Sequence, residues 1–173
     1  MENGKIRLKR PQWQDMEFIR WLWNDEETMS SVGGPVYLNE EQARRWFERI
    51  VDPGSSNDRF FLIINEKDIP VGEVSFHRLK IESMTAEFNI KIAEKYRNKG
   101  YGKVAMNLLL EYFFNEFGGL MMVDNVAIDN HAGQQALLKY GFEHDPSYKD
   151  VFRLVLSRQR FWDVIQKIET PTF

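Results

Sequence analysis

A short basic segment with two glycines contains the residue types that could bind an anion. It reads Arg97-Asn98-Lys99-Gly100-Tyr101-Gly102-Lys103. Glycines at alternate positions let a ligand approach the backbone without hindrance from Cβ atoms. An apolar helical pattern begins at Tyr101, and the N–H groups and dipole of a first helical turn favour a phosphate group. Because Arg97, Lys99 and Lys103 add positive charge, the segment predicts a site for a phosphate-bearing ligand.

Two other interpretations of the same glycines stay open. They could form a helix-entry turn with solvated basic neighbours. Residues 100–105 also match the dinucleotide pattern G-x-G-x-x-A, with Asp124 about 20 positions later. That pattern normally follows a strand directly, whereas Gly100 comes eight positions after Ile92. A P-loop is excluded because no Ser or Thr follows Lys103.

Composition excludes several other kinds of chemistry. The 173 residues include no cysteine, so disulfides, thiolate metal sites and a cysteine nucleophile are absent. We expect no metal site, since no two of His77, His131 and His144 have the spacing of metal ligands. A net charge of −3 argues against nucleic-acid binding. Without an apolar run of about 18 residues or a signal-peptide core in residues 1–12, we expect a cytoplasmic protein that does not bind membranes.

Hydrophobic periodicity predicts the elements that must position the basic segment. Residues 6–10 alternate in character and predict a strand, whereas Asp15 and Asn39 are expected to cap two helices. The second helix should end before Pro53. Three strands on short connections then predict an antiparallel meander, over residues 59–66, 71–80 and 85–92.

The pattern changes after this meander. Two helices are expected to alternate with two strands, in the order 101–117, 120–128, 130–140 and 150–158. A polar and apolar tail follows to Phe173. This order predicts a mixed sheet with helices on its faces. Because no repeat or linker interrupts the chain, we expect residues 1–173 to form a single domain.

The basic segment and the order of elements resemble the GNAT superfamily of acetyl-CoA-dependent N-acetyltransferases. Residues 97–102 are similar to the family's acetyl-CoA signature Q/R-x-x-G-x-G/A, and Asn130 precedes Gly141-Phe142 as in its N…GF ending. The resemblance covers nearly all of the chain. It implies an α/β fold, a mostly antiparallel mixed sheet of about seven strands flanked by helices. It also implies direct attack of a primary amine on acetyl-CoA.

The resemblance implies where acetyl-CoA would bind. The pyrophosphate would rest on the amides of Lys99 to Gly102, and the pantetheine arm would pair with the backbone of residues 89–92. One N–H group of that strand would polarise the thioester carbonyl. Asn130 would contact the pantetheine or a water, although its position also fits a helix N-cap. The implied cofactor-binding residues are Asn89, Ile90, Lys91, Ile92, Arg97, Asn98, Lys99, Gly100, Tyr101, Gly102, Lys103 and Asn130.

The resemblance also implies proton transfers. A free amine with a pKa near 10.4 must lose a proton, which requires a general base. Glu87 is the first candidate and Glu73 the second, and each could instead be a solvated or ion-paired strand carboxylate. Many family members carry a Tyr seven positions after the Asn to protonate the thiolate, but Leu137 stands there. Tyr140, one helical turn further, is the candidate replacement, although an apolar packing role is favoured for it. Water or a side chain from the substrate loop could protonate the thiolate instead.

The acceptor is expected between the two N-terminal helices and the meander. Aromatic and acidic side chains in those segments suit a cation, although tryptophans on a helix commonly belong to the core. These residues are Trp21, Trp23, Trp46, Glu26, Glu27 and Glu40. The resemblance leaves polyamines, protein N-termini such as those of ribosomal proteins, and aminoglycosides open as acceptors.

Two further expectations concern function and assembly. Because Leu137 replaces the Tyr, a non-catalytic CoA-binding module is the alternative function, and an NAD-dependent enzyme would be a third class. The aromatic residues Phe161, Trp162 and Phe173 are expected to cover the protein's own core or the partner in a homodimer.

Overall fold

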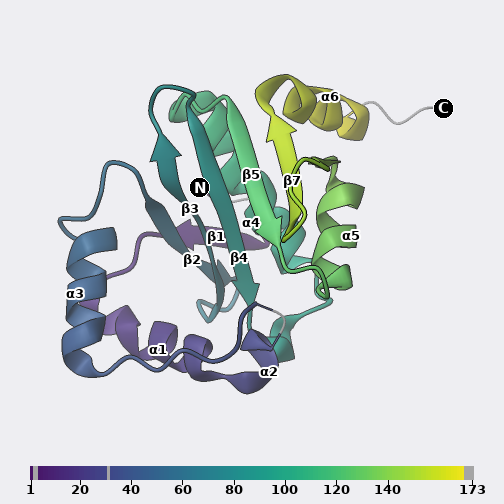
Figure 1. Ribbon diagram of the computed structural model, residues 1–173. Coiled ribbons are helices and arrows are strands. Elements are labelled where there is room, and N and C mark those ends of the chain that lie inside the picture. The colour runs from purple at the N-terminus through teal and green to yellow at the C-terminus, as the bar shows by residue number, and fades with distance from the viewer. Residues whose placement is uncertain (2–3, 31, 170–173) are drawn as a thin grey trace.

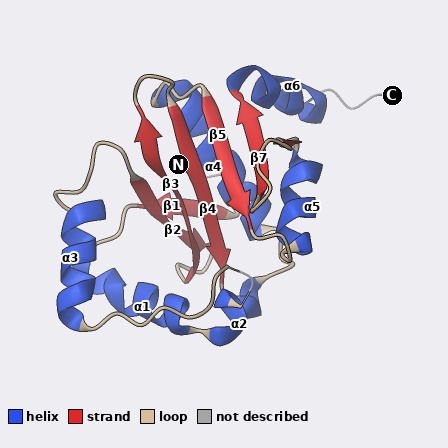
Figure 2. Ribbon diagram, viewed as in Figure 1, coloured by secondary structure: helices blue, strands red, loops and turns tan. Residues whose placement is uncertain are grey.

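The computed structural model describes residues 1, 4–30 and 32–169, which form a seven-stranded sheet with helices packed around it (Figures 1 and 2). The strands are β1 (Ile6–Lys9), β2 (Arg59–Asn65), β3 (Pro70–Lys80), β4 (Thr85–Ile92), β5 (Met121–Val126), β6 (Glu143–His144) and β7 (Phe152–Ser157). Their order in the sheet is β1-β2-β3-β4-β5-β7-β6. All neighbours are antiparallel except β4 and β5, which are parallel. The expected mixed and mostly antiparallel sheet is thereby confirmed.

Six α-helices connect and cover these strands. They are α1 (Met16–Asn24), α2 (Glu26–Met29), α3 (Glu40–Ile50), α4 (Tyr101–Glu111), α5 (His131–Tyr140) and α6 (Arg158–Glu169). Short 3₁₀ turns precede α1 and α4, at Trp13–Asp15 and Glu94–Tyr96. The predicted cap of α3 is confirmed, because the Asn39 side chain accepts a hydrogen bond of 2.9 Å from the Gln42 N–H group.

Two apolar clusters hold the helices against the sheet. Along β2, Phe60 and Leu62 pack with α1 and α3 on one face, whereas Ile63 and Phe61 pack with the α4 side on the other. This alternation is what the period of two in a strand requires. The sheet therefore carries α1 and α3 on one face and α4 on the opposite face, as Figure 1 shows.

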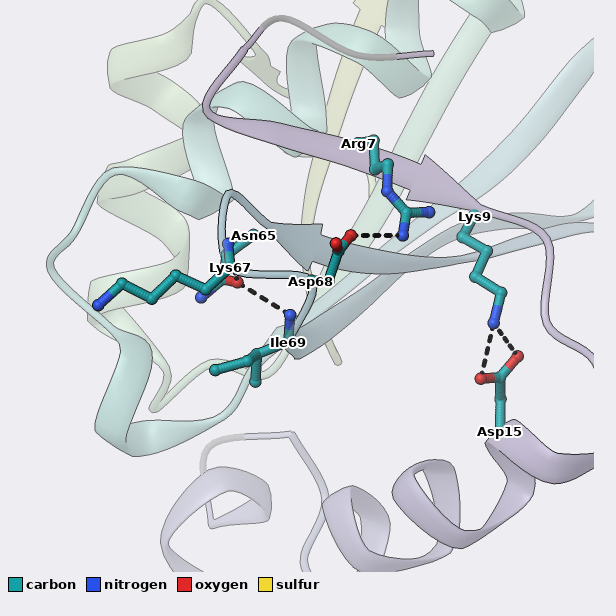
Figure 3. A network of polar contacts seen from close by, with 7 residues as sticks. All are labelled: Arg7, Lys9, Asp15, Asn65, Lys67, Asp68 and Ile69. Atoms are coloured by element: carbon teal, nitrogen blue, oxygen red, sulfur yellow. Dashed lines mark hydrogen bonds and ion pairs between the residues drawn. The ribbon is translucent and has the colours of Figure 1, made fainter.

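The first helix begins as predicted, with Asp15 at its N-cap position, but the Asp15 side chain does not cap it. This side chain instead accepts a hydrogen bond of 2.7 Å from the Gln12 N–H group. It also accepts one of 2.8 Å from Lys9 (Figure 3). In the same view Asn65 accepts hydrogen bonds from the N–H groups of Lys67 and Ile69, both at 3.0 Å, and so closes the turn between β2 and β3. The contact between Lys9 and Asp15 thus ties β1 to the start of α1, and the Asn65 contacts fix the turn after β2.

The tail after the last strand, for which no helix was predicted, forms the helix α6 over Arg158–Glu169. Phe161 is fully buried there and its ring lies 5.1 Å from that of Phe114, so apolar packing stabilises the helix. Trp162 remains 38% exposed, and Phe173 lies outside the described residues. The helix expected over 101–117 changes at Tyr112–Glu116 into a π-helical turn. The short elements α2 and β6 were also not predicted.

Candidate functional site

Strand β4 separates from β5 halfway along its length. Its parallel ladder with β5 ends at the pair Glu87 and Val123, whereas its ladder with β3 continues to the pair Ile92 and Gly72 (Figure 1). The N–H group of Ala93 donates to Val71 on the β3 side. Because backbone groups alternate along a strand, the N–H and C=O groups of Ile90 and Ile92 face away from β3. An extended ligand can pair with this open edge.

The glycine segment follows this edge immediately. Asn98 and Gly100 have left-handed backbone angles, with φ of 60° and 81°, and they turn the chain into α4. No side chain caps the first turn of α4, so N–H groups of this turn remain available to an anion. We refer to the open edge at Ile90 and Ile92 together with residues 97–103 as the glycine corner.

Gly102 leaves free space where a ligand would approach. A Cβ atom on Gly102 would lie 3.6 Å from Ile92 Cγ1 and 3.9 Å from Ile90 Cδ1, which are ordinary contact distances. The protein itself therefore tolerates a side chain, although glycine within a helix costs about 0.5–1 kcal/mol relative to alanine. The missing side chain keeps the helix start open beside the strand edge. This geometry fits a pyrophosphate attached to an extended arm.

Basic side chains gather around the same corner. The Lys5 Nζ atom lies 3.1 Å from the position of a Cβ atom on Gly100 and 5.7 Å from the centroid of the Tyr101 ring. Lys99 Nζ lies 5.2 Å from the ring centroid of Tyr96, and Lys103 is exposed. Sequence reasoning missed Lys5 because it is far from the corner along the chain and joins it only when β1 packs beside α4.

Arg97 has a role that the sequence did not predict. Its guanidinium donates to the carbonyl oxygens of Ile92 at 3.2 Å and Thr28 at 2.8 Å. The side chain therefore links the loop before α4 to the end of β4 and to α2. Its positive charge still lies beside the glycine corner, while its hydrogen bonds hold the loop in place.

Asn130 acts as a helix cap, one of its two predicted roles. Its Oδ1 atom accepts a hydrogen bond of 3.0 Å from the Gly133 N–H group at the start of α5. A Cβ atom on Gly133 would approach Asn130 Nδ2 to 2.8 Å, so this glycine is required for the close fit.

A cavity of about 530 Å³ lies over β2, β3 and β4, on the face that carries α1 and α3. Its apolar wall consists of Trp23, Trp46 and Phe60, whose rings contact one another edge to face. Its floor includes Glu73 and Lys91, which are directly opposite each other on β3 and β4. We refer to it as the sheet cavity.

The structure brings only part of the expected acceptor residues into the sheet cavity. Trp23 and Trp46 line it, whereas Trp21 and Glu40 line a different hollow of about 510 Å³ beside α1. Glu26 and Glu27 are exposed in the first turn of α2. Trp23 and Trp46 thus lie in the sheet cavity as expected, whereas Trp21 and the three acidic residues do not.

Glu73 is engaged in a buried polar network. It is 1% exposed, and its two carboxylate oxygens accept hydrogen bonds of 2.7 Å from Lys91 Nζ and from Trp23 Nε1. Lys91 also donates to Asn89 Oδ1 at 3.0 Å. Both oxygens of Glu73 are therefore satisfied within the protein.

Glu87 is the more accessible of the two predicted carboxylates. Its side chain is 26% exposed, and it contacts Arg78 at 3.0 Å and His77 at 3.5 Å. It lies where β4 leaves β5, opposite His77 on the face of the sheet that bears the cavity. Burial lowers the pKa of His77, so this imidazole is neutral at pH 7. Glu87 is thus a partly exposed carboxylate at the point where β4 leaves β5.

Leu137 and Tyr140 both lie in the apolar interior. They are 6% and 7% exposed, and the Tyr140 hydroxyl has no hydrogen-bond partner within the described part of the chain. Burial, and then the nearby Glu111 carboxylate, raise the pKa of Tyr140. A higher pKa makes this hydroxyl a weaker acid.

Asp124 is a titratable group that the sequence did not single out as catalytic. It follows Val123, the last residue of β5 that pairs with β4, and it is half-buried. Burial first, and then the Glu87 carboxylate, raise its pKa from 3.8 to about 7, while Lys91 opposes the shift. A carboxylate inside the mostly apolar strand of residues 121–126 was the signal that could have identified it.

The described residues contain neither a group of side chains that could hold a metal ion nor a helix that could span a membrane. No group of three or more His, Cys, Asp or Glu side chains there has the arrangement to hold a metal ion. None of the helices within residues 4–30 and 32–169 is long and apolar enough to span a membrane.

Comparisons with known proteins agree with this geometry. The profile of the acetyltransferase (GNAT) domain matches residues 5–143. An uncharacterized N-acetyltransferase, p20 of Bacillus licheniformis, is 22% identical over 149 residues, covering 84% of this chain and 83% of that protein. The spermidine N(1)-acetyltransferase of Vibrio cholerae is 21% identical over 169 residues, covering 92% and 96%. A crystal structure of spermidine N-acetyltransferase from V. cholerae in complex with CoA and spermine superposes with a TM-score of 0.82 at 20% identity, covering 92% of this chain and 99% of that chain.

Proposed function

The chain belongs to the acetyltransferase (GNAT) family and is an acetyl-CoA-dependent N-acetyltransferase, and on this premise we propose that it acetylates a primary amine bound in the sheet cavity. The observation that carries this proposal is the position of β4. Its open backbone edge at Ile90 and Ile92 is part of the glycine corner, while the side chains of Asn89 and Lys91 line the sheet cavity. On this proposal, one strand would carry the cofactor site beside the acceptor site.

We propose that the glycine corner holds acetyl-CoA through backbone groups. The edge of residues 89–92 would pair with the pantetheine arm, and the amides of Lys99 to Gly102 would bind the pyrophosphate. Lys5, Lys99 and Lys103 surround that position with positive charge. When bound, acetyl-CoA supplies the reactive thioester, and a strand N–H group polarises its carbonyl.

We propose Glu87 as the general base. An amine is protonated at pH 7, and a carboxylate must accept that proton, directly or through water, before the nitrogen can attack. Glu87 is partly exposed beside the strand opening, whereas both oxygens of Glu73 are occupied by Lys91 and Trp23. Glu73 therefore serves the structure of the cavity.

We propose Asp124 as the group that returns a proton to the leaving thiolate. Leu137 cannot donate a proton, and the raised pKa of Tyr140 makes its buried hydroxyl a poor donor. Asp124 lies on the strand that borders the opening, directly after the last ladder pair. Burial keeps this carboxyl group protonated over much of the neutral range.

The experiment that tests the function measures CoA release with a thiol reagent. We expect release with at least one member of a panel of polyamines, aminoglycosides, amino acids and peptides. Replacing Glu87 by Gln should lower kcat at pH 7 at least tenfold, because general-base catalysis contributes about 10²–10⁴-fold. The control is Glu82→Gln, in the exposed turn between β3 and β4.

Melting temperatures and rates of CoA release distinguish an acetyltransferase from a non-catalytic CoA-binding module and from an NAD-dependent enzyme. Acetyl-CoA should raise the melting temperature of both variants equally. Stabilisation by acetyl-CoA without turnover of any amine would indicate a non-catalytic CoA-binding module. An unchanged rate in Glu87→Gln would remove this residue as the base, and stabilisation by NADH instead of acetyl-CoA would contradict the cofactor.

We also propose that residues 1–173 act as one acyl-CoA N-acyltransferase domain in the cytoplasm, with a small molecule or a peptide N-terminus as the acceptor. Assembly into a homodimer remains a prediction, which gel filtration with light scattering would test.

A further inference from the structure

The sheet cavity contains cations that no carboxylate neutralises. From this we infer that its amine substrate also carries an anionic group, a carboxylate or a phosphate, and is not a polyamine. The inference rests on the proposed acetyl transfer in this cavity.

Two arginines provide the uncompensated charge. Arg49, in the last turn of α3, lines the cavity and forms no hydrogen bond or ion pair with another described residue. Arg59 begins β2, and its guanidinium donates to the carbonyl oxygens of Ser55 and Asp58 at 3.0 and 2.7 Å. Its Nε–H group also donates to the Tyr112 hydroxyl at 3.4 Å, and the guanidinium lies 5.0 Å from the ring centroid of Phe117, so Arg59 is held toward the α4 side at the edge of the cavity. Neither guanidinium contacts a carboxylate within the described part of the chain.

The carboxylates near the cavity already have partners. Glu73 accepts from Lys91 and Trp23, and Glu87 contacts Arg78 and His77. Asp58 accepts a hydrogen bond of 3.1 Å from the backbone N–H group of Arg78. A polyamine would have to displace these partners and would add its own positive charges to those of the wall.

An anionic group would instead be attracted by the positive charge of the cavity wall. A guanidinium binds carboxylate or phosphate through paired, charge-assisted hydrogen bonds, and Arg49, which lines the cavity, has no hydrogen-bond partner among the described residues. Binding an anion there neutralises charge without breaking a contact within the protein.

The register of the strands sets the size of such a substrate. Arg59 is opposite Phe76, which is opposite Phe88 of β4, the neighbour of Glu87. Two strand spacings, about 10 Å, thus separate the backbone of Arg59 from that of β4. A cavity of about 530 Å³ is in the range of small-molecule sites. An amine near Glu87 and an anion several bonds away, near Arg49, would match an amino acid or short peptide.

The test compares substrates that differ mainly in charge. We would measure CoA release with the dipeptide Ala-Glu against Ala-Gln amide, with O-phosphoethanolamine against ethanolamine, and with spermidine. We expect kcat/KM to be at least tenfold higher for an anionic amine than for its neutral counterpart and for spermidine. The carboxylate and phosphate pairs identify which anion is preferred.

The matched variants place the effect at the cavity. Arg49→Gln should raise KM for the anionic amine about tenfold with little change in kcat and in stabilisation by acetyl-CoA. Arg45→Gln is the control, because Arg45 is on the same helix but pairs with Glu41 at the surface.

Three results would count against the inference. Preference for spermidine over every anionic amine would overturn it while leaving the acetyltransferase activity established. An unchanged substrate preference in Arg49→Gln would overturn it as well. Absence of CoA release with every amine would contradict the proposed function itself, which is a different outcome from a changed preference.

Discussion

The glycine corner and the sheet cavity are adjacent but differ in how they are built. The corner consists mainly of backbone groups from one continuous stretch, at the end of β4 and the start of α4. The cavity consists of side chains from α1, α3, β2, β3 and β4, which are brought together only by folding. The first can recognise a constant ligand such as a diphosphate, whereas the second can vary its charge from one protein to another.

This difference predicts that each region can be disrupted without the other. The largest expected effect is on stability, from Glu73→Gln. It removes the negative charge that holds the buried Lys91, and loss of one partner of a buried ion pair costs about 3 kcal/mol or more. Urea unfolding would measure this loss.

The control for this prediction is the double variant Glu73→Gln with Lys91→Met, which removes both charges and should recover most of the stability. Acetyl-CoA should still raise the melting temperature of the single variant. A stability loss below about 1 kcal/mol would show that the pair is not effectively buried.

The next largest effect concerns the glycine corner, through Gly102→Glu. The new carboxylate would occupy the space over the helix start and repel phosphate, so we expect affinity for acetyl-CoA to fall at least 100-fold, about 2.7 kcal/mol. Stability should change by less than about 0.5 kcal/mol, because the protein leaves room for a Cβ atom and an acidic residue suits a helix N-terminus. Isothermal calorimetry and urea unfolding give the two quantities.

Gly102→Ala separates the effect of a Cβ atom at this position from the effect of a negative charge. It should keep or slightly raise stability and weaken acetyl-CoA binding less than Glu does. Retained affinity in Gly102→Glu would contradict the proposed position of the pyrophosphate.

The smallest effect lies between the two regions, at Asp124. Its pKa is raised in the folded protein from 3.8 to about 7, so the folded state holds the proton more tightly than the unfolded state. The stabilisation that the protonated Asp124 carboxyl group contributes to the folded state is therefore full below about pH 4 and is lost as the pH rises through 7. Asp124→Asn should remove this loss and be about 2 kcal/mol more stable than the parent at pH 8, because the half-buried carboxylate keeps part of its hydration.

Unfolding curves at pH 4, 6 and 8 would test this expectation, with Asp129→Asn, an exposed position, as the control. Parallel pH profiles for the parent and Asp124→Asn would show that the carboxylate is fully solvated. A slower release of CoA from Asp124→Asn would agree with its proposed role toward the thiolate.

The same comparison explains what the sequence predicted. Six of the seven strands, the meander, the helix start at Tyr101 and the cap at Asn39 depend on local periodicity and turn residues, and each could be identified, whereas the two-residue strand β6 could not. The tail could not, because α6 is held by the distant contact between Phe161 and Phe114. Lys5 beside Gly100 and the buried contact of Trp23 with Glu73 depend on tertiary packing, to which a single sequence gives no direct access.

The two hydrogen bonds of Arg97, to Ile92 and to Thr28, bear on any attempt to re-engineer this enzyme. Tyr37 and Leu38, which follow α2 and precede α3, line the hollow beside α1, so this part of the chain is a natural place to graft a new loop. Such a graft would share an anchor with residues 97–103 through the Thr28 carbonyl. Chimeras joined after Thr28 should therefore keep their use of acetyl-CoA, and chimeras that move α2 should lose it together with the old acceptor.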